Sequence, residues 1–176
     1  MRRVVTGVNS SGVSVFTRDD ESPHYIAMGN FQMGELWWES TAVISDGVSD
    51  PADGRVGAIP KTGEALVRYV VFPPQEEMRA LMEGAVDQAS AEQVSDDFHH
   101  EEDNPGMHTT ETVDYGFVLS GELILELDQG EKKVLKAGDC YVQNGTRHAW
   151  NNESDQQAVL GVVMLGADRA APTADK

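Results

Sequence analysis

Two histidines and one aspartate have the residue types and spacing that could do chemistry in this sequence. If the chain is extended from His108 onward, side chains alternate between the two faces of a strand, so His108, Thr110, Thr112 and Asp114 share one face. His148 lies on a second short extended segment farther along the chain. Two imidazoles and a carboxylate suit a divalent metal ion, and the same groups suit proton transfer near neutral pH.

Short strands joined by turns must position these side chains. An alternating apolar run that begins at Leu123 predicts a strand, and this strand ends in a turn at residues 128–130. The strand predicted for residues 140–143 ends at Asn144 and Gly145, the residue pair best suited to a tight hairpin with positive φ angles. The pattern is typical of an antiparallel β protein.

The stretch 107–152 resembles the two sequence motifs of the cupin superfamily. The first motif has the form G-x5-H-x-H-x3-4-E-x6-G, and counting back from Gly121 places its first histidine on His108. Thr110 stands in the place of the second histidine, and Asp114 stands in the place of the glutamate. In the second motif, roughly G-x5-P-x-G-x2-H-x3-N, the proline is missing and the matching residues are Gly138, Gly145, His148 and Asn151.

The resemblance implies a mainly all-β fold, a double-stranded β-helix or jelly-roll cupin barrel with extra N-terminal strands and one or two short helices. We expect a single domain over residues 1–165. Within it, residues 1–72 would form the N-terminal strands, 75–104 a helix and an acidic linker, and 105–165 the barrel strands that carry the motifs. The tail 166–176, rich in alanine and polar residues, is expected to be disordered.

Local patterns agree with that architecture. Residues 3–17 contain two short strand-forming runs around a turn-rich quartet and predict a hairpin. Apolar positions from Met78 follow helical spacing and predict an amphipathic helix that ends near Ser90. Beyond it, His99 and His100 stand among carboxylates, but adjacent side chains point apart, so we interpret this segment as a solvated linker rather than a metal site.

Composition sets the outer limits. The 176 residues suffice for one domain, and the formal net charge of −17 argues against nucleic acid or an anionic membrane as a partner. The single cysteine, Cys140, cannot form an intramolecular disulfide, and no apolar run reaches the roughly 20 residues of a membrane span. We therefore expect a cytoplasmic protein, and the resemblance to cupins implies a homodimer.

The expected barrel pocket would bind a small-molecule ligand. His108, Asp114 and His148 would act there as catalytic residues or as metal ligands, and other side chains would form the walls. The predicted wall residues are Thr110, Thr112, Tyr115, Phe117, Tyr141, Gln143, Trp150 and the pair Trp37 and Trp38. The aromatic residues among them favour a flat apolar or aromatic substrate.

The resemblance implies an enzyme of the lyase (decarboxylase or dehydratase), isomerase or cyclase class that acts on a small organic, aromatic or polyketide-like molecule. Without a metal, His148 would be the general acid or base, held by Asp114 or a neighbouring hydroxyl. A site with one Fe, Mn, Zn or Ni ion is an equally open alternative and would support a metal-dependent dioxygenase. A non-catalytic binding protein is the remaining alternative.

Overall fold

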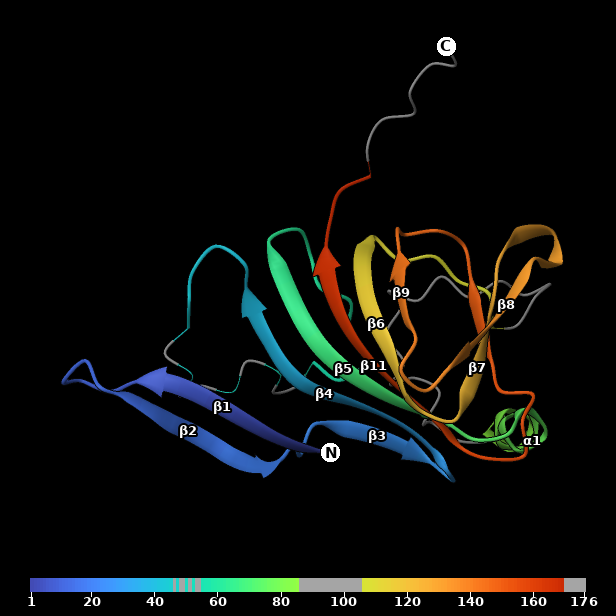
Figure 1. The fold of residues 1–176 in the computed structure, drawn as a ribbon, viewed down its shortest axis with the longest axis horizontal. Helices are drawn as coiled ribbons and strands as arrows, with labels where there is room; N and C mark the ends of the chain where they lie inside the picture. Colours follow the sequence, from blue (N-terminus) through green and yellow to red (C-terminus); the bar gives the residue numbers. More distant parts are fainter. Residues whose placement is uncertain (46, 48–49, 51, 53–54, 86–105, 170–176) are drawn as a thin grey trace, which may run out of the picture.

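The computed structural model describes residues 1–45, 47, 50, 52, 55–85 and 106–169, and strands dominate this part of the chain. The predicted mainly β class is confirmed. The largest sheet contains six antiparallel strands, and Figure 1 shows it as a curved surface through the centre of the molecule. In spatial order its strands are β3 (Tyr25–Met28), β4 (Phe31–Ser40), β5 (Glu64–Phe72), β11 (Ala158–Gly166), β6 (Thr112–Ser120) and β9 (Cys140–Gln143).

A second antiparallel sheet has three strands, in the order β10 (Ala149–Asn151), β7 (Glu122–Glu126) and β8 (Lys132–Lys136). Between β7 and β8 the chain turns through a short 3-10 segment at Asp128–Gly130, where the sequence predicts a turn. A backbone bridge joins the segment before β6 to the segment before β10, because His108 and His148 each donate an N–H to the other's carbonyl, at 2.9 and 3.0 Å.

The N-terminal hairpin predicted from the sequence is confirmed. Strands β1 (Arg2–Val8) and β2 (Ser14–Glu21) pair with each other as a separate two-stranded sheet, seen at the lower left of Figure 1. The buried guanidinium of Arg3 joins the two strands of this hairpin to the β4–β5 connection, because it donates to the carboxylate of Asp20 on β2 at 2.8 Å and to that of Asp50 at 2.5 Å.

The one α-helix of the described residues follows β5 directly. Helix α1 (Gln75–Ala85) begins just after Pro73 and Pro74, as prolines at the first turn permit, and its first residue donates a backbone N–H to the carbonyl of Asn152 at 2.7 Å. The helix therefore begins three residues before the predicted first apolar position, Met78. Its predicted continuation to residue 90 and the acidic segment with His99 and His100 lie outside the described residues.

The prediction of a tight hairpin at Asn144 and Gly145 is wrong. Strand β9 does end there, and Gly145 has a positive φ of 58°. However, β9 pairs with β6 in the large sheet, whereas the next strand, β10, pairs with β7 in the small one. The turn therefore carries the chain from one sheet to the other, a distinction that turn-forming residues alone do not encode.

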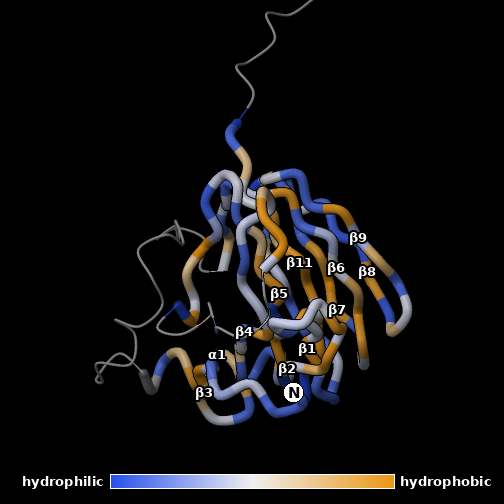
Figure 2. Tube along the Cα trace, turned by 90° about the vertical axis from the view of Figure 1, so that its left-hand side faces the viewer, coloured by the Kyte–Doolittle hydropathy of each residue, from blue (hydrophilic) through white to orange (hydrophobic). Residues whose placement is uncertain are grey.

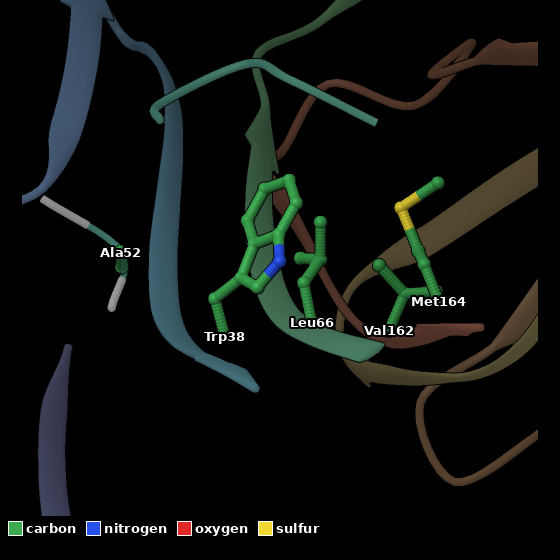
Figure 3. Packing of buried hydrophobic residues seen from close by; sticks show 5 residues of the cluster. All are labelled: Trp38, Ala52, Leu66, Val162 and Met164. Atoms are coloured by element: carbon green, nitrogen blue, oxygen red, sulfur yellow. The ribbon is translucent and has the colours of Figure 1, made fainter. Parts of the chain in front are cut away.

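Apolar side chains of the central strands pack into two buried clusters. Figure 2 shows β11 as largely hydrophobic, and Figure 3 shows side chains of β4, β5 and β11 packed together. The aligned register explains this packing, since Trp38 is opposite Leu66 and Leu66 is opposite Met164. One buried cluster contains Trp38, Ala52, Leu66, Val162 and Met164, and the other contains Val118, Leu123, Ala158 and Leu160.

The described chain continues through residue 169, past the predicted end of the domain at residue 165. Gly166 still belongs to β11, and the backbone N–H of Ala167 donates to the carbonyl of Glu111 at 3.0 Å. The rest of the predicted disordered tail, residues 170–176, lies outside the described residues. No helix among the described residues is long and apolar enough to cross a membrane. The domain boundaries, the homodimer and the cytoplasmic location stay predictions.

Candidate functional site

A cavity of about 270 Å³ lies between the large sheet, helix α1 and the segments that carry His108 and His148. Apolar side chains form most of its wall, and this composition is typical of small-molecule sites. Five methionines contribute to it, together with aromatic and branched residues. These apolar residues are Met28, Met33, Met78, Met82, Met164, Phe31, Phe72, Val70, Leu160, Val162, Tyr141 and Trp150.

The two histidines line the cavity as a pair. Their ring centroids lie 4.3 Å apart, and each ring has its Nδ1 at 2.9 Å from a backbone carbonyl, that of Gly106 for His108 and that of Thr146 for His148. A carbonyl can only accept a hydrogen bond, so Nδ1 carries the hydrogen in each neutral ring. The lone pair of each neutral imidazole is therefore on Nε2. A backbone carbonyl thus holds the Nδ1 of His148, where the sequence predicted Asp114 or a neighbouring hydroxyl.

His148 is the more deeply placed histidine, with only 3% of its surface exposed. Burial, followed by the nearby charge of His108, lowers the pKa of His148 to about 4. The ring is therefore neutral at physiological pH. In this state it can accept a hydrogen bond or a proton at Nε2, but it cannot serve as a cationic acid.

Asp114 lies on β6 with its side chain turned inward, as the alternation of that strand predicts. Burial raises the pKa of its carboxyl to about 6, although a hydrogen bond from Thr112 and the positive charge of Arg68 act in the opposite direction. Within the described part of the chain its Oδ1 is buried without a hydrogen-bond partner. Such an acceptor is costly to leave unpaired, so the cavity presents an unused acceptor to any ligand inside it.

Tyr141, on β9, adds a hydroxyl to the same cavity. Burial and the neighbouring charge of Asp114 raise the pKa of this phenol, so the hydroxyl keeps its hydrogen. Its ring packs on Trp150 with centroids 4.8 Å apart and covers Gly116 of the adjacent strand, where any Cβ would collide with the ring. Glycine at position 116 thus makes room for a tyrosine that reaches the cavity.

A buried ion pair lies in the same sheet, on strands β4 and β5. Glu35 of β4 and Arg68 of β5 are paired in the register, and the Arg68 Nη2 donates to Glu35 Oε1 at 2.7 Å. Their side chains are 0% and 3% exposed, and the same guanidinium donates to the carbonyl of Ala58 at 2.7 Å. Arg68 also lines the cavity, so its positive charge faces the cavity. Its counter-ion, the carboxylate of Glu35, is buried in the wall.

The remaining polar residues that the sequence predicted support the site. Thr110 lines the cavity, and its hydroxyl lies 2.9 Å from that of Thr112, which is buried beside it. Gln143 does not line the cavity; its amide donates to the carbonyl of Thr146 at 3.0 Å. That contact holds the same backbone group that orients His148.

Four aromatic residues that were predicted to line the cavity do not line it. Tyr115 and Phe117 are 45% and 53% exposed, because odd-numbered positions of β6 face away from the cavity while Asp114 faces into it. Trp38 is buried in the core cluster, with Arg55 over its ring, and does not line the cavity. Trp37 does not line it either, and its indole N–H donates to Glu39 at 3.2 Å.

Sequence reasoning missed Arg68 and the methionines. A charged residue in an otherwise apolar strand, with an opposite charge at Glu35 in another strand, was the available signal for a buried pair. The contribution of Met78 and Met82 from α1 had no comparable signal, since helical periodicity does not say which surface a helix covers.

The predicted metal site is only partly assembled. Each imidazole, when neutral, has its lone pair on Nε2 and its Nδ1 fixed by a carbonyl, and this arrangement suits a transition metal. Asp114, the third predicted ligand, lines the same cavity. However, the described ranges contain no group of three His, Cys, Asp or Glu side chains placed to hold a metal ion. The metal stays a prediction.

Comparison with known proteins places these features among relatives. A family model described as "Cupin domain" matches residues 97–164. The chain is 38% identical over 169 residues to the "Cupin-domain-containing oxidoreductase fogC" of Aspergillus ruber, and this alignment covers 93% of the chain and 70% of that protein. It is 29% identical over 168 residues to the "Cupin-domain-containing oxidoreductase srdD" of Neurospora crassa, covering 92% and 71%.

Other relatives match over a shorter stretch. The "Phomopsin biosynthesis cluster protein C'" of Diaporthe leptostromiformis is 58% identical over 85 residues, covering 38% of the chain and 45% of that protein. The chain thus spans less than half the length of this relative. Among solved structures, a Cupin 2 conserved barrel domain protein from Salinispora arenicola is similar with a TM-score of 0.43 at 15% identity, covering 79% of each chain.

Proposed function

This chain belongs to the cupin superfamily, and from that premise we propose that it is an enzyme that binds a small, mostly apolar organic molecule in its cavity and transfers a proton there. The observation that carries the proposal is the buried, unpartnered Oδ1 of Asp114, which faces an otherwise apolar cavity beside a neutral histidine. Proton transfer is the step that isomerases, cyclases and lyases such as dehydratases share.

Asp114 is the base in this proposal. With a pKa of about 6, its carboxyl is mostly ionised at neutral pH and yet close enough to neutrality to take a proton from a substrate. The apolar surroundings strengthen its interaction with the proton it removes, because water does not screen it there. Its Oδ1 accepts the hydrogen of a substrate hydroxyl or of a carbon next to a carbonyl.

Tyr141 and His148 supply the complementary groups. The Tyr141 hydroxyl stays protonated and donates a hydrogen bond to a substrate oxygen on which negative charge develops. Neutral His148 accepts at Nε2 and so fixes a second hydroxyl of the substrate or relays a proton. This division of roles differs from the prediction that His148 alone is the general acid or base.

The sheet register orients the substrate. Along β11, Met164 pairs with Asp114 of β6, and two residues farther on Val162 pairs with Arg68 of β5. The next register pairs in the same direction are apolar: Leu160 with Val70, and then Ala158 with Phe72. Helix α1 comes directly after Phe72, so its methionines lie at the end away from Asp114. The polar part of the substrate therefore lies near Asp114 and its hydrocarbon part near α1, where flexible methionines adapt to its shape.

Deuterium wash-in tests the proposed chemistry without knowledge of the natural substrate. Uncharged ketones and aldehydes of increasing chain length are incubated with the protein in D2O at pH 8, and mass spectrometry measures deuterium gain. Wild-type protein should catalyse exchange for a subset of them, and Asp114→Asn should slow it by about 100-fold or more. Glu122→Gln, which removes an exposed carboxylate paired with Lys136, should leave the rate unchanged.

Binding without exchange would favour the alternative of a non-catalytic binding protein. Calorimetry on the same compounds separates the two cases, since a binding protein would keep its affinity in Asp114→Asn or gain affinity for apolar compounds. Exchange at equal rates in wild type and Asp114→Asn would contradict the assignment of the base.

A metal-dependent oxidoreductase is the second candidate. The paired imidazoles of His108 and His148 favour it, and the relatives from Aspergillus ruber and Neurospora crassa carry the name oxidoreductase. A bound Fe, Mn, Zn or Ni ion would supply Lewis-acid or oxygen chemistry at these ring nitrogens. Elemental analysis of untagged protein, together with oxygen consumption on the compound panel, distinguishes this candidate from metal-free proton transfer.

A further inference from the structure

The three residues that follow β11 contact neighbouring segments at three points, and one of these contacts is to Thr110 of the cavity lining. The backbone N–H of Ala167 donates to the carbonyl of Glu111 at 3.0 Å, and Asp168 accepts a hydrogen bond from the Thr62 hydroxyl at 2.7 Å. The guanidinium of Arg169 forms the third contact. Residues 167–169 are therefore held at the edge of the cavity next to Thr110, which we call the rim.

Arg169 connects two segments that are remote in sequence. Its Nη2 donates to the carbonyl of Gly145 at 2.8 Å and to the carbonyl of Thr110 at 3.2 Å. Thr110 follows His108 by two residues, and Gly145 precedes His148 by three. One cationic group thus bridges the two segments that carry the histidine pair, and hydrogen bonds from a charged donor are stronger than neutral ones.

The two segments already touch at this place. A Cβ on Gly145 would lie 2.9 Å from the carbonyl oxygen of Thr110 and 3.3 Å from that of Thr112, so their backbones are in close contact. Backbone carbonyls need hydrogen-bond donors when water is excluded, and Arg169 supplies one donor group to the carbonyls of Thr110 and Gly145. The same two segments are also joined by the backbone bridge between His108 and His148 and by the pairing of β6 with β9.

We propose that Arg169 is a positioning residue of this cavity: it clamps the Thr110 and Gly145 carbonyls and so fixes the relative placement of the His108 and His148 rings. The importance of this placement for catalysis rests on the proposed function, but the clamp itself does not. The clamp lies between two other connections of these segments, the backbone bridge at His108 and His148 and the register pair of Asp114 with Gln143, and it ties the stretch between them.

The placement of Arg169 separates this role from general support of the fold. The residue is exposed and belongs to no strand, and both buried clusters form without it. Its loss should therefore loosen the rim locally and leave the sheets intact. The carbonyl that orients the His148 ring, that of Thr146, directly follows Gly145, so a shift of this segment reaches the ring.

The test compares Arg169→Ala with Arg147→Ala, a matched control that removes a positive charge next to His148. Arg147 donates to Asp128 at 2.6 Å and is not part of the clamp. Backbone amide exchange of His108 and His148 should accelerate about tenfold or more in Arg169→Ala, while amides between β5 and β11 keep wild-type rates. Ring ¹⁵N shifts at pH 8 should change from one tautomer to a mixture, and Arg169→Lys should restore both signals in part.

Three results would overturn the proposal. Histidine spectra of Arg169→Ala that overlay those of wild type would show that no clamp acts on the rings. Equal changes in Arg147→Ala would show that only a charge is sensed. A global loss of folded structure in Arg169→Ala would make Arg169 a general fold residue. None of these readouts needs a substrate, so failure of the proposed function would show separately, as absent deuterium exchange in a protein with wild-type histidine spectra.

Discussion

Replacing Asp114 by asparagine should make the protein more stable at neutral pH. The raised pKa means that the folded state binds the carboxyl proton more tightly than the unfolded state does. The stabilisation that comes with the protonated form is complete below about pH 4, the ordinary range of aspartate, and is lost as the pH rises through about 6. Asparagine stays neutral at every pH and should avoid that loss.

The expected size of the effect follows from the two pKa values. Moving a carboxyl from 3.8 to about 6 corresponds to about 3 kcal/mol, since each tenfold change in proton affinity is worth about 1.4 kcal/mol. Asp114 is only 5% exposed, so solvent screening reduces this figure little. In a domain of this size the change amounts to a rise in Tm of roughly 6–12 °C at pH 8 and close to none at pH 4.

Urea unfolding followed by tryptophan fluorescence, at several pH values between 4 and 8 and constant ionic strength, measures the difference between the two proteins. Burial lowers the pKa of His148 and gives stability that is present above pH 6.5 and lost as the pH falls through about 4. This contribution exists in both proteins and cancels in the difference. The difference curve therefore isolates Asp114.

Asp19→Asn is the control. Arg2 donates to the Asp19 carboxylate and lowers its pKa, so this substitution should weaken the protein above pH 4 rather than strengthen it. Our reasoning about Asp114 would be refuted by a difference between wild type and Asp114→Asn that does not vary with pH, or by a wild type that is the more stable protein at pH 8. Either result would mean that the carboxylate is well solvated or paired in solution.

Three further predictions address the surroundings of the cavity. Glu35→Ala should cost about 3–5 kcal/mol in urea unfolding, because it leaves the buried guanidinium of Arg68 without its counter-ion; Glu35→Gln should cost less. Gly145→Ala should cost about 1–3 kcal/mol, because the positive φ and the nearby Thr110 carbonyl both oppose a Cβ, and an unchanged Tm would contradict the close contact. Elemental analysis of untagged protein tests the metal prediction: near-stoichiometric metal that His148→Ala removes would establish the site, and metal-free folded protein would end it.

The sequence predicted the individual strands well because strand signals are local. The hairpin of residues 2–21, the inward side of β6 and the end of β9 follow from alternation and turn residues. The same alternation shows why Tyr115 does not line the cavity, since a residue next to Asp114 in a strand must face the other side. The prediction that Tyr115 lines the pocket relied on its aromatic character and not on its position in the strand.

Residue types alone thus determined a β protein whose His108, Thr110, Asp114 and His148 turn toward one interior. Only the tertiary structure decided which sheet each strand joins, and therefore that the turn at Gly145 crosses between sheets. It also decided the chemical state of the site, because a pKa depends on burial and neighbours that come from many segments. The contact of Arg169 with the rim also depends on the tertiary structure, because the backbone positions of two distant segments decide whether this long exposed side chain reaches a carbonyl.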